Sequence, residues 1–204
     1  MAKLKKTKNE LKAQREALQR YHRFLPTLEL KKQQLQREVR RAEAALREHT
    51  MQDEALLERL RPWARLLTSL PDLGDYVRIE AIDQEAANVA GVTVPVLTGV
   101  RFVRPQIDYF ETPAWLEDAI VVLTDLTRVR AELTVLERRK ELLGEELRIT
   151  AQRVNLFEKV MIPRTEENMR IIRIALGDAQ TAAVARAKLA KGKGAELLSG
   201  VAGA

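Results

Sequence analysis

The sequence predicts a mainly α-helical protein: a long antiparallel two-helix coiled coil from the N- and C-terminal segments, with a small middle region containing a β-hairpin. Three observations predict this fold class. Aromatic residues make up only 4% and charged residues 31% of the 204-residue chain, a composition that suits solvated helices better than a thick core. Apolar residues repeat in heptads near both ends of the chain. A stretch rich in β-branched residues, glycine and proline separates the two repeats.

The first segment, residues 1–61, is expected to form one coiled-coil helix. Steps of seven residues from Leu4 land on apolar side chains with the exception of Lys32, and a second series from Thr7 is mixed early and mostly apolar later. Such a sustained heptad repeat is typical of a coiled coil. Roughly sixty residues at ~1.5 Å each would make a rod about 90 Å long. Pro26 leaves the phase of the repeat unbroken, so we expect a bend there rather than a helix end.

The middle region, residues 62–114, is expected to hold a short helix and a β-hairpin. Its stretches "YVRIEAI", "VTVPV" and "GVRFV" alternate with a period of two between glycines and prolines, which is typical of strands. Two antiparallel strands with a loop near Asn88 to Gly91 are the simplest arrangement. Because an isolated hairpin is marginal in water, it must pack on the helices or on a partner.

The third segment, residues 115–190, is expected to form the second coiled-coil helix. Thr112 is a candidate N-cap and Pro113 suits the first helical position. Heptads run from Ala119 to Met161, but beyond Pro163 they fit only in a shifted phase that includes Met169, Ile172, Leu176, Ala179, Ala183 and Ala190. The seam therefore slips by about one residue at Pro163, where we also expect a bend.

The last segment, residues 191–204, is rich in glycine and lacks periodicity, so we expect a flexible tail. Because the middle region reverses the chain, the two long helices can pair antiparallel and bury each other's apolar stripes. This pairing would place Leu4 near the residues around 190.

The sequence carries no recognisable signature of catalysis or of metal binding. His22 and His49 lie far apart and the chain has no cysteine, so no zinc site is expected. The "KGKG" stretch at residues 191–194 lacks the spacing of a phosphate-binding loop, and no strand leads into it. We therefore expect no catalytic residue, no cofactor and no metal site.

The net charge of +6 leaves several kinds of partner open: nucleic acid, an anionic membrane, an acidic protein, or no partner at all. Acidic residues are interleaved with the basic ones and no aromatic residues alternate with them, which disfavours nucleic acid. The first residues lack the apolar run of a signal peptide, and the longest purely apolar run is too short to span a membrane. These features lead us to expect a cytoplasmic protein.

Three stretches, in this order along the chain, resemble one known family. They are "TKNELKAQREALQRYHRFLPTLELKKQQLQ", "NVAGVTVP" and "QRVNLFEKVMIPRTEENMRIIRIAL". Together they resemble the D subunit of the V-type (V/A-type) ATPase and ATP synthase, in its bacterial form. The third stretch is the most similar, including Arg153 to Asn155 and Ile162 to Arg164. The resemblance covers nearly the whole chain, although the glycine-rich C-terminus departs from it.

The resemblance implies the central rotor shaft of a rotary ATPase or ATP synthase, with ATP synthesis and ion transport as functions of the whole complex. The implied partners are a hexamer of catalytic A and B subunits, the small F subunit, and the socket subunit of the membrane rotor. Catalytic residues would belong to A and B, and the chain would be peripheral to the membrane in the soluble sector. Partner contacts are expected at the basic ends of the helices: Lys3, Lys5, Lys6, Lys8, Lys188 and Lys191.

One alternative stays open beside the rotor shaft: a free-standing coiled-coil scaffold or a nucleic-acid-associated protein. The predicted hairpin separates the two, because a plain scaffold has no need of it. For the rotor shaft, we expect Pro163 to bend the rod and make its surface asymmetric.

Overall fold

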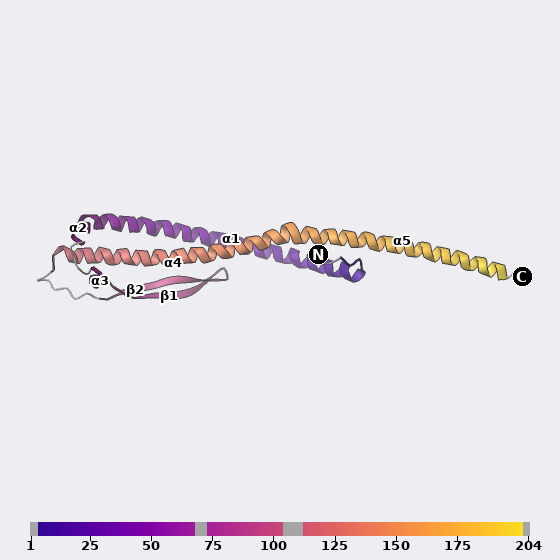
Figure 1. The fold of residues 1–204 in the computed structure, drawn as a ribbon, viewed down its shortest axis with the longest axis horizontal. Coiled ribbons are helices and arrows are strands. Elements are labelled where there is room, and N and C mark those ends of the chain that lie inside the picture. Colours follow the sequence, from indigo (N-terminus) through magenta and orange to yellow (C-terminus); the bar gives the residue numbers. More distant parts are fainter. Residues whose placement is uncertain (1–3, 68–72, 104–111, 202–204) are drawn as a thin grey trace. The chain divides into compact units, whose positions relative to one another are not determined.

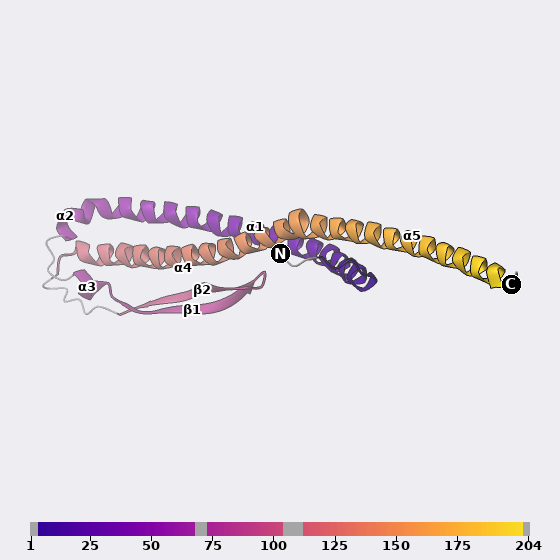
Figure 2. The same cartoon turned by 45° about the vertical axis from the view of Figure 1, so that its right-hand side comes forward.

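The computed structural model describes residues 4–67, 73–103 and 112–201. In chain order, two long helical stretches precede and follow an antiparallel β-hairpin, which lies beside α4 (Figures 1 and 2); this architecture confirms the predicted fold class. The elements in chain order are α1 (Lys8–Leu60), the 3₁₀ turn η1 (Arg61–Trp63), α2 (Ala64–Leu67), α3 (Leu73–Tyr76), β1 (Ile79–Val89), β2 (Val92–Phe102), α4 (Trp115–Leu156), the π turn η2 (Phe157–Met161) and α5 (Ile162–Val201).

The chain forms two compact units. Unit 1 consists of residues 1–29 and 152–204, and unit 2 consists of residues 30–151. In each unit a part of α1 packs against a part of the returning helical stretch. The division between the two units falls inside the long helices, after residue 29 and after residue 151.

Unit 1 is a two-helix pair with an apolar seam. The rings of Tyr21 and Phe157 lie with their centroids 5.2 Å apart, and the Gln14 side-chain oxygen accepts a hydrogen bond of 3.5 Å from Asn168. Because lower numbers on α1 meet higher numbers on α5, the helices run antiparallel. Met169 and Ile172 are buried in this seam.

The pairing in unit 1 is shorter than the heptad pattern predicts. Every residue from 177 to 191 is exposed, so α5 has no neighbour along this stretch among the described residues. The contact between Gln14 and Asn168 places Lys8, the first residue of α1, near the level of residue 174 in an antiparallel pair of equal rise, so α1 ends before it reaches the exposed stretch. The expectation that Leu4 lies near residue 190 is therefore wrong. A heptad repeat leaves the pairing register open, because every seven-residue shift buries a similar stripe.

Unit 2 buries its apolar side chains in two clusters. The first joins Leu35 of α1, Val94 of β2 and Leu143 of α4, each exposed by 1% or less. The second joins Leu60 of α1 with Val122 and Leu126 of α4. The predicted hairpin thus packs on the helices through β2, which supplies the support that two strands alone lack.

The hairpin turn explains where the chain reverses. Val89 pairs with Val92, so Ala90 and Gly91 alone form the turn. Both have positive φ, 52° and 80°, as the type I′ turn of a tight hairpin requires. The Asn88 side-chain oxygen accepts a hydrogen bond of 3.0 Å from the Gly91 N–H. The predicted loop near Asn88 to Gly91 is confirmed.

Three features of the long helices refine the expectations from the sequence. α1 is continuous through Pro26, as the unbroken heptad phase predicts, and Thr27 Oγ1 donates a hydrogen bond of 2.8 Å to the Phe24 carbonyl nearby. α4 begins at Trp115, two residues after Pro113. The backbone of α5 is helical to Val201, so residues 191–201 belong to a helix despite their glycines.

Leu35→Ala should test whether the first cluster holds unit 2 together. Leu35 is 0% exposed and contacts both the hairpin and α4. Removing its side chain should lower the free energy of unfolding by about 2–5 kcal/mol, because a cavity remains. Leu30→Ala is the matched control, since Leu30 is 57% exposed and its loss should change stability by less than about 0.5 kcal/mol. Urea unfolding measures both, and equal effects would contradict the packing described.

Candidate interaction surface and helix irregularity

The structure places the predicted contact lysines on the surface of unit 1. Lys5, Lys6, Lys8, Lys188 and Lys191 are exposed, and none has an ion pair within the described part of the chain. Lys3 lies outside the described residues. The two groups are not brought together: Lys8 stands near the level of residue 174, and Lys188 follows about 20 Å further along α5.

Charge is divided unequally between the two units. Unit 1 has 17 Lys and Arg against 8 Asp and Glu, a net charge of +9, whereas unit 2 has 18 against 21, a net charge of −3. The total of +6 thus hides one strongly basic unit and one weakly acidic unit. The sequence indicates that the ends of the chain are basic, but it does not reveal the difference in net charge between the units. That difference becomes visible only when the fold shows that residues 1–29 and 152–204 belong to one unit.

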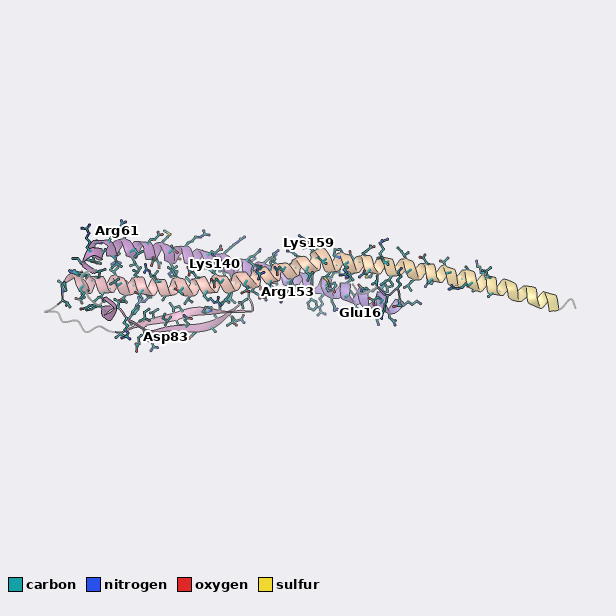
Figure 3. All side chains as sticks on the ribbon, in the orientation of Figure 1. Glu16, Arg61, Asp83, Lys140, Arg153 and Lys159 are labelled. Carbon is teal, nitrogen blue, oxygen red and sulfur yellow. The ribbon has the colours of Figure 1, made fainter. Side chains whose placement is uncertain are left out.

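Internal ion pairing follows the same division. Two ion pairs occur among the described residues of unit 1, Lys12 with Glu16 at 3.9 Å and Arg170 with Glu167 at 2.8 Å. In unit 2, ion pairs connect α1 to α4, including Lys31 with Glu146 at 2.7 Å and Asp53 with Arg130 at 2.9 Å. Most basic side chains of unit 1, among them Arg153 and Lys159 (Figure 3), have no ion pair within the described residues and are exposed to groups outside the chain.

A π turn precedes Pro163. In η2 the Ile162 N–H donates to the carbonyl of Phe157, five residues back instead of four. Pro163 has no N–H, and in a regular α-helix its ring would meet the carbonyl of Lys159. A wider turn relieves this conflict by accommodating one extra residue. The ring itself is exposed, so the irregularity does not disturb the packed side of the helix.

As far as Leu176, the seam after Pro163 follows the shifted phase that the sequence predicts, whereas Ala179, Ala183 and Ala190, also predicted in this phase, are exposed. Thr165, Met169 and Ile172 are buried, whereas Arg164, on the unshifted heptad, is exposed. The one extra residue in the π turn accounts for the shift of the heptad phase by one residue. No residue pattern signals the π turn directly. The proline and the phase change together are the only hints that could have found it. The bend at Pro163 stays a prediction.

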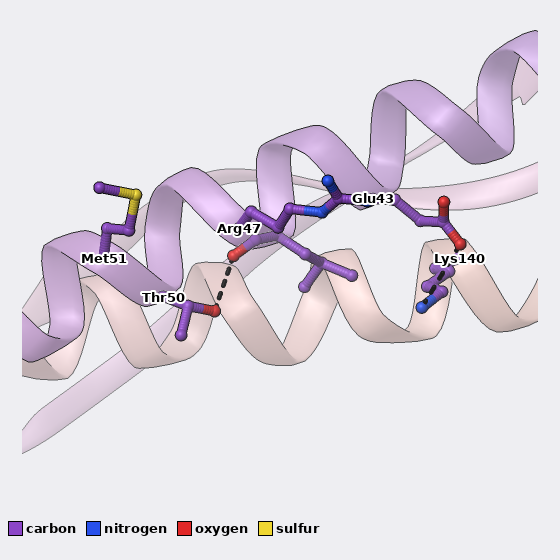
Figure 4. A pocket seen from close by; sticks show the side chains of 6 residues that line it. Glu43, Arg47, Thr50, Met51 and Lys140 are labelled. Carbon is purple, nitrogen blue, oxygen red and sulfur yellow. Dashed lines mark hydrogen bonds and ion pairs between the residues drawn. The ribbon is translucent and has the colours of Figure 1, made fainter.

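Unit 2 contains an open groove between α1 and α4 with a volume of about 550 Å³. Its lining residues are Glu43, Leu46, Arg47, Thr50, Met51 and Lys140 (Figure 4). Lys140 pairs with Glu43 at 3.7 Å, and Thr50 Oγ1 donates a hydrogen bond of 2.7 Å to the Leu46 carbonyl. The groove has neither a nucleophile with an adjacent base nor a set of metal ligands, so its chemistry is that of a helix surface.

Two features are absent from the described residues. Within the described ranges, no three His, Asp or Glu side chains gather closely enough to hold a metal ion. Across the same part of the chain, no helix combines the length and the hydropathy of a membrane span.

The Glu167–Arg170 pair is the one place in the described chain where a pKa shift stands out. Arg170 donates from Nε and Nη2 to the two carboxylate oxygens of Glu167, each over 2.8 Å. This hydrogen bonding is the main cause that lowers the pKa of Glu167 and raises the pKa of Arg170. Both side chains are exposed, so the pair is a surface feature with little weight in the stability of the fold.

Arg170→Gln should return the pKa of Glu167 to its ordinary range, because the main cause of the shift is removed. The lowered pKa means that the pair stabilises the fold above the ordinary carboxyl pKa and ceases to do so as pH falls through the folded-state pKa. NMR titration of the Glu167 carboxyl carbon measures the change. Arg173→Gln is the matched control, because Arg173 is exposed and has no ion pair within the described residues. An unchanged titration in R170Q would contradict the assignment.

Comparison with known proteins adds to this geometry. The model of the family described as the D subunit of ATP synthase matches residues 10–192. The D subunit of the V-type ATP synthase of Borreliella burgdorferi is 39% identical over 191 residues, covering 94% of this chain and 95% of that protein. The proteins of the same name from Chlamydia muridarum and Chlamydia trachomatis serovar L2 are 35% and 34% identical, each covering 93% of this chain and 95% of the relative. A helix pair with an inserted hairpin, and similarity along nearly the whole length, lead to one conclusion: the chain belongs to the family of ATP synthase D subunits.

Proposed function

We propose that this chain is the non-catalytic central shaft of a V-type ATP synthase. It couples ATP turnover in a hexamer of A and B subunits to rotation of an ion-translocating ring in the membrane. The observation that carries the proposal is unit 1, an antiparallel helix pair with a net charge of +9 and few internal ion pairs among its described residues. Beyond residue 176, α5 continues with every described side chain exposed. Such a surface suits insertion into a surrounding protein.

Long paired helices suit the transmission of torque. A helix rises about 1.5 Å per residue, so a short chain makes a long rod, and lateral pairing stiffens it. A pair of helices also presents different side chains in different directions. Inside a sleeve of threefold symmetry, each catalytic site therefore meets a different face. Differential contact of this kind lets the shaft angle and nucleotide affinity bias each other reciprocally.

The exposed lysines of unit 1 fit a contact that slides rather than locks. Lys5, Lys6 and Lys8 have no ion-pair partner among the described residues. Solvated charges facing acidic loops attract over a distance set by salt, without the fixed geometry of a buried pair. We therefore assign them to the A and B hexamer. The small F subunit and the socket subunit contact unit 2, which carries the hairpin, and the protein is peripheral to the membrane on the cytoplasmic side.

A free-standing scaffold or nucleic-acid-binding protein is the second candidate. The packed hairpin argues against a plain scaffold, since Val94 is 1% exposed between the helices and the strands. Nucleic acid is disfavoured because the aromatic residues in the seam of unit 1, Tyr21 and Phe157, pack against each other rather than forming a stacking platform.

The rotor assignment is tested by assembly. The chain, co-expressed with the A, B and F subunits of the same organism, should co-purify with all three as one complex that hydrolyses ATP. The chain alone should hydrolyse none. Retention on DNA or RNA that disappears with added salt, without assembly into the ATPase, would instead support the nucleic-acid-associated alternative.

A triple variant, Lys5→Gln, Lys6→Gln and Lys8→Gln, sharpens this test. Its association with the A and B hexamer should be slower and less dependent on salt, because exposed charges mainly steer encounter. The matched control replaces Arg37, Arg40 and Arg148 of unit 2 with Gln. These residues are also exposed and without ion pairs in the described chain, so the same net charge is lost. Equal effects in both variants would contradict the assignment of the contact to unit 1.

Pro163→Ala should change the shaft itself. The substitution removes the ring and restores an N–H, so the π turn at residues 157–161 loses its cause and the helix should straighten. The altered surface should lower the ratio of ions moved to ATP hydrolysed in the assembled complex. Arg164→Ala, at the exposed neighbouring residue, is the control. The same curvature and the same coupling ratio in P163A would overturn the role given to the proline.

A further inference from the structure

The two edges of the hairpin differ in what lies beside them. β2 faces the helices: Val94 is buried, Pro95, Val96 and Leu97 line a cavity of about 240 Å³ together with residues of α1 and α4, and Phe102 lies under the Arg128 guanidinium at 5.9 Å. No residue of β1 lines that cavity, although the side chains of Ala87 and Val89 pack from the face of β1 against the cluster of Leu35, Val94 and Leu143. β2 accordingly lies between α4 and β1, and β1 is the outermost strand of unit 2 (Figures 1 and 2).

The pairing register shows which backbone groups of β1 are free. Val89 and Val92 flank the two-residue turn and so form a hydrogen-bonded pair of the antiparallel ladder. From there, hydrogen-bonded pairs alternate with pairs that have no ladder hydrogen bonds. The pairs without these bonds are Asn88 with Thr93, Ala86 with Pro95, and Gln84 with Leu97. Pro95 fits this assignment, because a residue without an N–H loses nothing at such a position.

The N–H groups of Gln84, Ala86 and Asn88 therefore point away from β2, toward the open side of β1. On the opposite edge, Pro95 removes one of the corresponding groups from β2. Proline on an edge strand blocks pairing with a further strand, and β1 contains none. The three residues are also exposed, so a strand can approach them from solvent.

The charge on β1 has one sign. The strand "IEAIDQEAANV" contains three acidic residues and no basic one. Asp83 pairs with Arg101 across the ladder at 3.1 Å. Glu80 and Glu85 are exposed and have no ion pair in the described part of the chain. These two carboxylates therefore leave β1 with a net negative charge that the described part of the chain does not neutralise.

We propose that the outer edge of β1 is a docking surface for an extended segment of a partner protein that carries Lys or Arg, added to the hairpin as a third strand. The outward N–H and C=O groups of β1 supply the backbone pairing, and Glu80 and Glu85 select for basic side chains. A second copy of this chain is disfavoured as the occupant, because pairing of β1 with β1 would bring acidic residues together and no basic ones. The proposal goes beyond the rotor assignment and does not depend on it.

The test uses the full chain and two synthetic probes. One is an extended peptide of about eight alternating lysine and valine residues, and the other has glutamate in place of lysine. The lysine peptide should bind and slow amide hydrogen exchange at Gln84, Ala86 and Asn88, while the glutamate peptide should not bind. Glu80→Gln with Glu85→Gln should weaken binding of the lysine peptide by about tenfold and reduce its dependence on salt.

Ala86→Pro removes one outward N–H without touching a ladder bond, and should also weaken binding by about tenfold or more. Thr93→Pro is the matched control, since Thr93 occupies a non-bonded pair on the other strand and its N–H points away from β1. Thermal unfolding and exchange of the ladder amides establish that the hairpin is intact in each variant. If A86P disturbs the hairpin, the affinity of the variant with Glu80→Gln and Glu85→Gln for the lysine peptide tests the proposal by itself.

Three results in the peptide experiments would overturn the proposal. They are equal binding of the two peptides, unchanged affinity in the glutamine variant, and exchange protection on the helices instead of β1. Self-association of the chain through β1, seen as a dimer that A86P abolishes, would show that a second copy occupies the edge and would likewise refute the basic partner.

Discussion

The narrow apolar seam between α1 and the returning helix is the constraint on which the rest of this structure depends. Two helices bury only a stripe, so few side chains are sealed from water in either unit. In unit 2 the hairpin widens the core by placing Val94 between Leu35 and Leu143. In unit 1 no such addition is present among the described residues, and the pair relies on Val154, Met169, Ile172 and their neighbours.

The distribution of charged side chains follows from the same constraint. Most positions on a helix pair face water, and these positions can carry either internal ion pairs or unpaired charges. Unit 2 uses them for links such as Lys31 with Glu146 and Asp53 with Arg130, which hold α1 to α4 beside the hairpin. Unit 1 leaves most of its cations unpaired within the described chain. The first choice suits a self-contained body and the second suits contact with another molecule.

Side-chain patterns revealed most of the architecture in advance. Heptad spacing from Thr7 located the buried Leu35 and Ala42, and alternation between glycines and prolines located the hairpin with its turn. The phase change at Pro163 was also predictable, because the spacing of the apolar residues changes there. The π turn behind it was not, since a backbone widening has no residue signature of its own.

Pairing register and charge grouping needed the structure. Successive heptads are nearly equivalent, so nothing in them decided that Gln14 meets Asn168 and that α5 extends far beyond the start of α1. The sequence showed the candidate lysines as basic clusters. The combined net charge of the two ends of the chain becomes apparent only once the structure shows that residues 1–29 and 152–204 form one unit. The free edge of β1 likewise depends on the register of the ladder, which alternation alone leaves undefined.

The solitary stretch of α5 between residues 177 and 191 is rich in alanine, the residue with the highest intrinsic preference for helix. Its residues are all exposed, and the backbone is helical along the whole stretch. A segment that is helical before it meets its partner has lost its conformational entropy in advance of binding. Association at this end of the molecule is therefore the docking of a ready-made rod rather than coupled folding and binding.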